Sequence, residues 1–154
     1  MNWNTAVRAS FVAVAATLAV GVPGAAATTL RGMTEDGTKI TLKRSHSKVS
    51  KIRTMVPAMC VETTGSGFTR AGGELFRAPG SYALGRQRKA KALQRAAMNQ
   101  GIKATKNYTV KLTDAGGGAV SGKLSLNFSF LIPDLYRSMP YIYLCQGTTT
   151  FTAS

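Results

Sequence analysis

Hydrophobic and polar residues alternate with a period of two along most of the chain after residue 27. This period places successive side chains on opposite faces of a strand, and it is typical of a sheet with one buried and one solvated face. It predicts strands over residues 38–42, 48–60, 108–112, 120–130, 141–145 and 148–153. The clearest is 120–130, where Gly122 interrupts an otherwise apolar face and suits a bulge or a close crossing of strands.

Residues 85–101 (GRQRKAKALQRAAMNQG) break this rhythm. The segment contains no β-branched residue and no proline, and good helix formers dominate it. At 100° per residue, Arg88, Lys91 and Arg95 form a basic stripe opposite a narrow apolar side made mostly of alanine. The pattern therefore predicts an amphipathic basic helix over about residues 86–100.

Short strands with turn signals and one helical insertion favour an all-β fold. We expect an antiparallel β-sandwich of the Ig-like or Greek-key type with the amphipathic basic helix inserted. A small closed barrel is the alternative.

The first 27 residues have the three-part pattern of a cleavable signal peptide. A short polar segment with Arg8 precedes an apolar run over residues 11–22, and small alanines at 25–27 precede the expected cleavage site. A transmembrane anchor needs about 20 apolar residues, which is more than this run provides. We therefore expect residues 28–154 to be a single domain that is secreted or held in the cell envelope. The alanine-rich leader is typical of bacteria.

Cys60 and Cys145 both follow the leader. A secreted chain meets an oxidising compartment, and two cysteines allow one intramolecular pairing. The alternatives are a redox pair, which usually has C-x-x-C spacing, and a structural zinc site, which needs four ligands. Neither pattern is present, so we predict a structural disulfide and neither a metal site nor a cofactor.

The leader is followed by a G-x-T-x-x-G-x-x-[apolar]-x-[apolar] opening, a strand with the first cysteine, a strand–turn–strand with a central glycine, and a final C-x-G segment before an aromatic-containing strand. The residues that carry these features are Gly32, Thr34, Gly37, Ile40, Leu42, Cys60, Val120, Ser121, Gly122, Lys123, Leu124, Cys145, Gln146, Gly147, Phe151, Thr152 and Ala153. In this order they resemble a group of small secreted bacterial β-sandwich domains without assigned function. The resemblance departs at the basic segment and at residues 131–139. It supports the disulfide and the sandwich, and it supplies no catalytic residue.

The formal net charge is +14, from 20 Lys and Arg against 6 Asp and Glu. Ten basic residues lie in two stretches, one strand-linked and one in the predicted helix: Lys43, Arg44, Lys48, Lys51 and Arg53, and Arg86, Arg88, Lys89, Lys91 and Arg95. Such stretches bind polyanions, including nucleic acid, anionic polysaccharide, phosphate polymers and acidic lipid headgroups. The alternative is an ordinary solvated surface, since charge aids solubility and lysines on edge strands block edge-to-edge pairing.

No residue pattern indicates catalysis. His46, the only histidine, lies among cationic neighbours that oppose metal binding, and no G-x-S-x-G elbow is present. Glycines 116–118 lack the ending of a phosphate loop, and paired carboxylates that meet only in space stay open. We expect a non-enzymatic module with a structural or binding role. The second hypothesis is a binder of polyanions or of an anionic membrane surface that acts through the basic helix at 86–95.

Overall fold

The computed structural model describes residues 26–98, 102–133 and 139–154. Residues 1–25, which make up most of the predicted signal peptide, lie outside the described part of the chain. No helix long and apolar enough to span a membrane occurs among the described residues.

Nine strands form one antiparallel sheet. They are β1 (Thr28–Thr34), β2 (Lys39–Ser45), β3 (Lys48–Glu62), β4 (Thr69–Phe76), β5 (Ser81–Ala83), β6 (Gln87–Arg95), β7 (Lys103–Gly116), β8 (Ala119–Ile132) and β9 (Tyr141–Ala153). The hydrogen-bonded order is β4-β3-β2-β1-β9-β8-β7-β6, and β5 pairs with β3.

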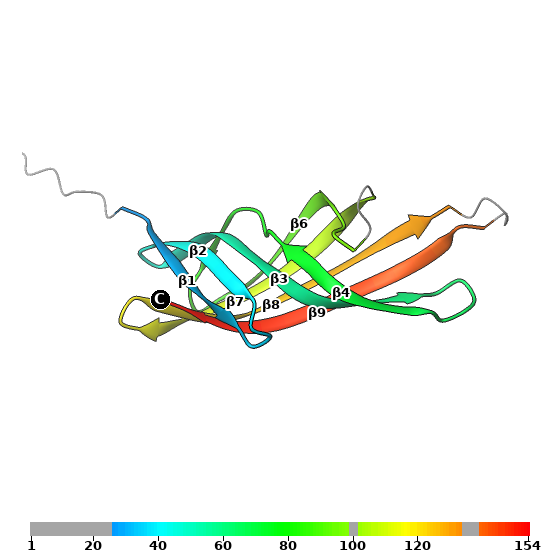
Figure 1. Cartoon of the computed structure of the whole chain (residues 1–154). Coiled ribbons are helices and arrows are strands. Elements are labelled where there is room, and N and C mark those ends of the chain that lie inside the picture. Colours follow the sequence, from blue (N-terminus) through cyan, green and yellow to red (C-terminus); the bar gives the residue numbers. More distant parts are fainter. Residues whose placement is uncertain (1–25, 99–101, 134–138) are drawn as a thin grey trace, which may run out of the picture.

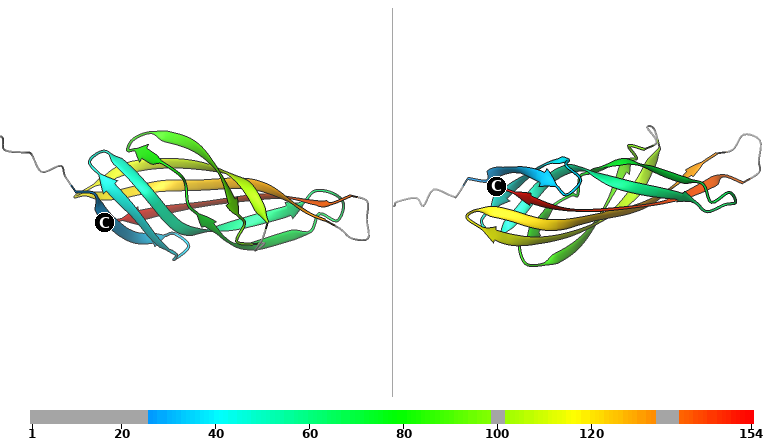
Figure 2. Two further views of the ribbon diagram at one scale, coloured as in Figure 1. Left: turned by 90° about the horizontal axis from the view of Figure 1, so that it is seen from above. Right: turned by 60° about the horizontal axis from the view of Figure 1, so that its bottom comes forward.

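Two meanders of consecutive hairpins, β1–β4 and β6–β9, meet at β9. Strand β9 pairs with β8 along its length, with β1 at residues 32–34, and with β3 at residues 58–62. The β1–β2 hairpin therefore lies between β3 and β9 at one end of the sheet, whereas β3 and β9 pair directly at the other. The sheet twists along a long axis, and the β3–β4 and β8–β9 hairpins lie at the end opposite the C-terminus (Figures 1 and 2).

The alternation seen in the sequence separates an inner face, which is buried, from an outer face. On β8, Leu124 and Leu126 are buried, whereas Lys123 and Asn127 are exposed. The aromatic rings of Phe76 and Tyr108 pack edge to face in the buried core, with ring centroids 4.9 Å apart. Other buried core side chains come from both meanders: Ile40, Leu42, Val49, Ile52, Val56, Tyr82, Val110, Leu112, Val120 and Phe151.

Gly122 lies on the inner face of β8, at a close approach of strands. A Cβ atom at this position would lie 2.6 Å from the carbonyl oxygen of Lys111 on β7, so any other residue collides with backbone. The pairing of Gly122 with Leu112 continues the register without a shift. The glycine therefore marks a close crossing, one of its two predicted roles, and no bulge occurs here.

The predicted helix over residues 86–100 is wrong. Residues 87–95 form β6, which pairs with β7 from Gln87↔Lys111 to Arg95↔Lys103. Ala90 and Ala92 are half-buried against the core, and the residues between them and on either side are exposed. Helix propensity differs among ordinary residues by less than about 1 kcal/mol, so backbone pairing along a whole strand outweighs it.

The all-β class and the antiparallel pairing are confirmed, but the predicted sandwich gives way to one continuous sheet. Strand twist accumulates across a sheet, and here it brings the two edges together. Gln94 on β6 donates through Nε2 to the carbonyl oxygen of Arg77, which follows β4, at 2.9 Å. Arg88 on β6 donates to the carbonyl oxygen of Ser81 on β5 at 2.8 Å. The sheet thus folds over its own core.

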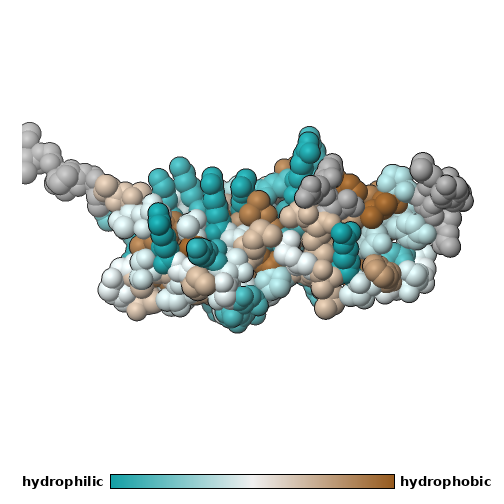
Figure 3. Space-filling model, in the orientation of Figure 1, coloured by the Kyte–Doolittle hydropathy of each residue, from teal (hydrophilic) through white to brown (hydrophobic). Residues whose placement is uncertain are grey.

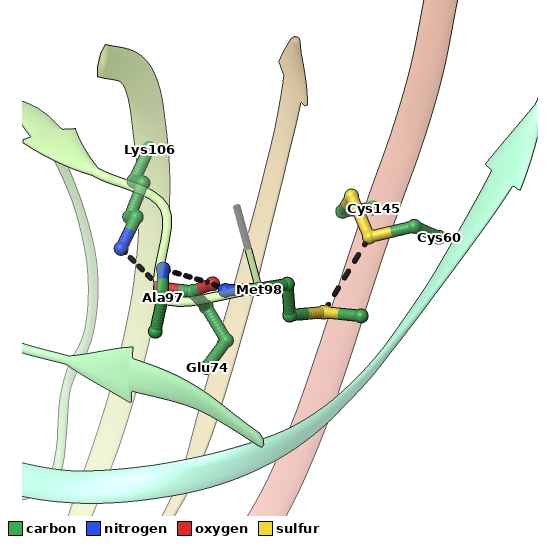
Figure 4. The surroundings of a disulfide bond; sticks show 6 residues. All are labelled: Cys60, Glu74, Ala97, Met98, Lys106 and Cys145. Carbon is green, nitrogen blue, oxygen red and sulfur yellow. Dashed lines mark hydrogen bonds and ion pairs between the residues drawn. A yellow bond between two sulfur atoms is a disulfide. The ribbon is translucent and has the colours of Figure 1, made fainter. Parts of the chain in front are cut away.

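A buried ion pair joins the edge strand β4 to β7, the strand next to the other edge. The side chains of Glu74 on β4 and Lys106 on β7 are 0% and 1% exposed, and Lys106 donates to the Glu74 carboxylate. Lys106 Nζ also donates to the carbonyl oxygen of Arg95 at 3.0 Å. Glu74 accepts in addition from the backbone N–H groups of Ala97 and Met98, at 2.9 and 3.3 Å (Figure 4). Both charges are therefore compensated by charge and by hydrogen bonds.

Cys60 and Cys145 form the predicted disulfide. They are direct partners in the register of β3 and β9, with Cα atoms 4.0 Å apart. The sulfur of Met98 lies 3.6 Å from the Sγ atom of Cys60 (Figure 4). The bond therefore locks the place where the two meanders pair directly.

Candidate anion-binding face

The basic side chains of β6 divide between the two faces of the sheet. Lys89, Lys91 and Arg95 occupy alternate outward positions and are exposed. Arg88 points the other way: it donates to Ser81 and lies 6.0 Å from the ring centroid of Tyr82. Three of the five basic residues predicted in this stretch thus share one surface. Arg86, also exposed, precedes the strand.

Three further lysines, which the sequence did not mark as binding residues, extend this surface. Lys103 and Lys111 lie on β7 and Lys123 on β8, and all three are exposed. The register places Lys103 beside Arg95 and Lys111 beside Lys123. The sequence indicates these lysines only through their outward positions in two strands that a short turn joins. We call Lys89, Lys91, Arg95, Lys103, Lys111 and Lys123 the basic face.

Lys111 and Lys123 are directly opposite each other on β7 and β8. Like charges at opposed positions destabilise a sheet, and neither lysine forms an ion pair among the described residues. Both line a shallow hollow of about 650 Å³ whose other lining side chains are rich in hydroxyl groups. An anion bound between the two lysines would relieve their repulsion.

Glu35 is the carboxylate that also lines this hollow. Its side chain accepts hydrogen bonds from the backbone N–H of Thr150 at 3.1 Å and from the Thr150 hydroxyl at 2.9 Å. These two hydrogen bonds hold the side chain of Glu35 against β9, at one side of the hollow. The lysines face it from β7 and β8.

The other predicted basic stretch lies elsewhere in the sheet. Lys48, Lys51 and Arg53 are exposed on β3, and Lys43 is half-buried on β2. No strand pairing joins β2 or β3 to β6. The structure therefore does not bring the two stretches together by pairing. Hydrophilic side chains stand out along the side of the molecule that carries β2, β3 and β6 (Figure 3).

Arg44, which belongs to the same stretch, already forms an ion pair with Asp114. Its Nη2 and Nη1 atoms donate to the two carboxylate oxygens of Asp114 at 2.7 and 3.3 Å, and Nη1 also donates to the carbonyl oxygen of Ala119. The hydrogen bond from Arg44 is the main cause that lowers the pKa of Asp114. Arg44 thus ties the β2–β3 hairpin to the β7–β8 turn, so it does not belong to a free basic surface.

Glu35 is the carboxylate that shares a hollow with lysines of the basic face, and the other described carboxylates have partners elsewhere. Within residues 26–98, 102–133 and 139–154, ion pairs join Asp114 to Arg44 and Glu74 to Lys106. Asp36 accepts from the hydroxyl of Thr149 at 2.6 Å. In the described part of the chain, no carboxylate forms an ion pair with a residue of the basic face.

Glu62 is held within a turn at the far end of β3. Its carboxylate accepts from the backbone N–H and the hydroxyl of Thr64, at 2.8 and 2.6 Å, and from the backbone N–H of Ser66 at 3.0 Å. The Ser66 hydroxyl also donates to it. Hydrogen bonds from Ser66 and Thr64 lower the pKa of Glu62 from 4.5 to about 2.

This shift predicts a specific acid dependence of stability. Because the folded pKa of Glu62 is depressed, its contribution is complete above pH 4.5 and is lost as the pH falls towards about 2. Glu62→Gln should therefore destabilise the protein at pH 7 and flatten the fall of melting temperature between these pH values. Glu35→Gln is the matched control. Equal acid dependence in Glu62→Gln and the unaltered chain would contradict the prediction.

In the described residues, no group of three or more His, Cys, Asp and Glu side chains is placed to hold a metal ion. His46 is exposed at the turn between β2 and β3, with a φ of 52°. Its carbonyl oxygen accepts from Arg44 Nε at 3.1 Å. The histidine thus has an exposed turn position.

Comparison with family models, curated proteins and solved structures finds no significant match to this chain. A functional assignment therefore rests on the chemistry of its own surface.

Proposed function

We propose that this protein is a non-enzymatic binding module that holds an anionic polymer on the basic face of β6, β7 and β8. The opposed pair Lys111 and Lys123 carries the proposal, because neither lysine forms an ion pair in the described structure. Lys89 and Lys91 continue the positive charge on the neighbouring strand. A linear polyanion along this face would meet several lysines at once and release the cations condensed on its own charges.

The neighbouring side chains favour a hydroxyl-bearing or phosphate-bearing polymer. Thr113, Ser121, Thr150 and Thr152 line the hollow beside the two lysines, and hydroxyl groups both donate and accept hydrogen bonds. Aromatic side chains, on which single-stranded nucleic acid stacks, are absent from the outward positions of β6–β8 in the described residues. An anionic polysaccharide or a phosphate polymer therefore suits the face better than nucleic acid.

The proposed place of action is outside the cytoplasm, either secreted or at the cell envelope. The disulfide is compatible with an oxidising compartment. The leader-like sequence of residues 1–27 supports the same location.

Retention on immobilised heparin tests the proposed function. We expect the logarithm of affinity to fall linearly with the logarithm of salt concentration, and Lys111→Ala with Lys123→Ala to lower that slope by about 2. The control is Lys48→Ala with Arg53→Ala, which removes the same charge from exposed positions of β3.

An equal loss in both double variants would mean that net charge alone causes retention. That result, or retention that does not depend on salt, would overturn the assignment of the basic face.

A further inference from the structure

A second hollow lies on the outer face, close to the disulfide. It measures about 690 Å³, within the usual range for small-molecule sites. Met59 and Val61 of β3 and Leu144 of β9 supply its exposed apolar lining. These three side chains are 50%, 39% and 54% exposed. Neighbouring apolar side chains that remain in water on a folded surface are typical of a binding site.

The apolar part of this groove is rigid. Val61 and Leu144 are direct partners in the register of β3 and β9. The adjacent pair, Cys60 and Cys145, carries the disulfide, which fixes the spacing of the two strands. A site that is formed before its ligand arrives loses less entropy on binding.

The remaining lining is mostly polar, apart from Phe128 and the disulfide-bonded Cys145, and among the described residues its one charged side chain is Lys91 of β6. Amide and hydroxyl groups of β7, β8 and β9 lie between this lysine and the apolar side chains. Asn107 donates through Nδ2 to the Oδ1 atom of Asn127 at 3.0 Å, which orders two of these amides. Among the described residues, no carboxylate lines the groove and Lys91 forms no ion pair.

We propose that this groove binds a free single-chain amphiphile with one anionic head group, such as a fatty-acid anion. Its alkyl chain would cover Met59, Val61 and Leu144, which removes apolar surface from water. Its head group would lie towards Lys91, across the amide-bearing strands. Charge complementarity decides the sign of the head group, because Lys91 is the one charged side chain in the described lining. This site is separate from the Lys111–Lys123 hollow of the proposed function.

Binding of dodecanoate below its micelle concentration tests the proposal, by calorimetry and by NMR shifts of the purified protein. We expect the largest shifts at Val61, Asn127 and Leu144. Lys91→Ala and Leu144→Asp should each weaken binding about tenfold. Lys89→Ala is the matched control because Lys89 lies two residues away on the same face of β6 but does not line the groove.

Uncharged dodecyl maltoside and cationic dodecyltrimethylammonium should both bind more weakly than dodecanoate. If Leu144→Asp does not fold, Leu144→Thr takes its place, with the melting temperature recorded for each variant.

Three results would overturn the proposal: equal weakening by Lys89→Ala and Lys91→Ala, full affinity in the Leu144 variant, or binding to anionic phospholipid vesicles without binding of monomeric dodecanoate. Heparin retention of Lys111→Ala with Lys123→Ala reports on the other hollow. The two proposals can therefore fail independently.

Discussion

Replacing Lys106 with Met should lower the free energy of unfolding by about 3–5 kcal/mol, because it leaves the buried Glu74 carboxylate without its counter-charge. Glu74 is fully buried, and only backbone hydrogen bonds, from Leu75, Ala97 and Met98, would remain to stabilise its charge. Since the pair joins β4 to β7, its loss also weakens the contact between the two ends of the strand order. Urea denaturation at pH 7 measures the effect.

Two variants separate charge from packing at this site. Lys103→Met changes an exposed residue of the same strand and should shift stability by at most about 0.5 kcal/mol. Adding Glu74→Gln to Lys106→Met should restore most of the lost stability, because the amide oxygen still accepts from the backbone and no charge stays buried. If the single variant Lys106→Met is as stable as the unaltered protein, the stabilising role assigned to the ion pair is contradicted.

Removing the disulfide should lower the free energy of unfolding by a similar amount. The bond spans a sequence separation of 85 residues, and the chain-entropy relation gives about 4–5 kcal/mol for a loop of that size. The double variant Cys60→Ala with Cys145→Ala should therefore unfold at a markedly lower urea concentration. Loss of buried sulfur contacts with Met98 adds to the effect.

Reduction provides the control for this prediction. Dithiothreitol should destabilise the unaltered protein and leave the double alanine variant unchanged. Two free thiols, detected by alkylation and intact mass in protein purified without reductant, would contradict the bond itself.

The alternation of apolar and polar residues predicts most of the strands. A strand that buries every second side chain needs an apolar residue at every second position. The strand expected at 120–130 lies within β8, and those expected at 141–145 and 148–153 belong to the continuous β9. The irregularity of β3 could not be foreseen. Lys51 has a φ of 53° where the β2–β3 register shifts, and lysine has no intrinsic preference for that conformation.

The error at 86–100 has a physical cause in the alanines. Ala90 and Ala92 alternate with Lys89 and Lys91 in period two, but alanine is also the best helix former. With so small an apolar side chain the two patterns are hard to distinguish within one chain. Pairing with β7, which a single sequence does not reveal, decides between them.

The candidate sites were predictable only in part. Local clustering identified Lys89, Lys91 and Arg95 but not Lys111 and Lys123, which are 12 residues apart in sequence and meet only through the β7–β8 register. The disulfide followed from chemistry because only two cysteines exist. The ion pair of Glu74 and Lys106 was invisible, since neither residue type is normally buried.

The junction of the two meanders at β9 has a consequence for how the chain folds. Hairpins within β1–β4 and within β6–β9 close short loops, whereas β9 must find β1 and β3 across most of the described sequence. The entropic cost of closing long loops is therefore concentrated in one late step, the docking of β9 on β1 and β3. Non-local β pairings of this kind form slowly. Once oxidised, Cys60 and Cys145 keep the two halves tethered through every partial opening of that junction.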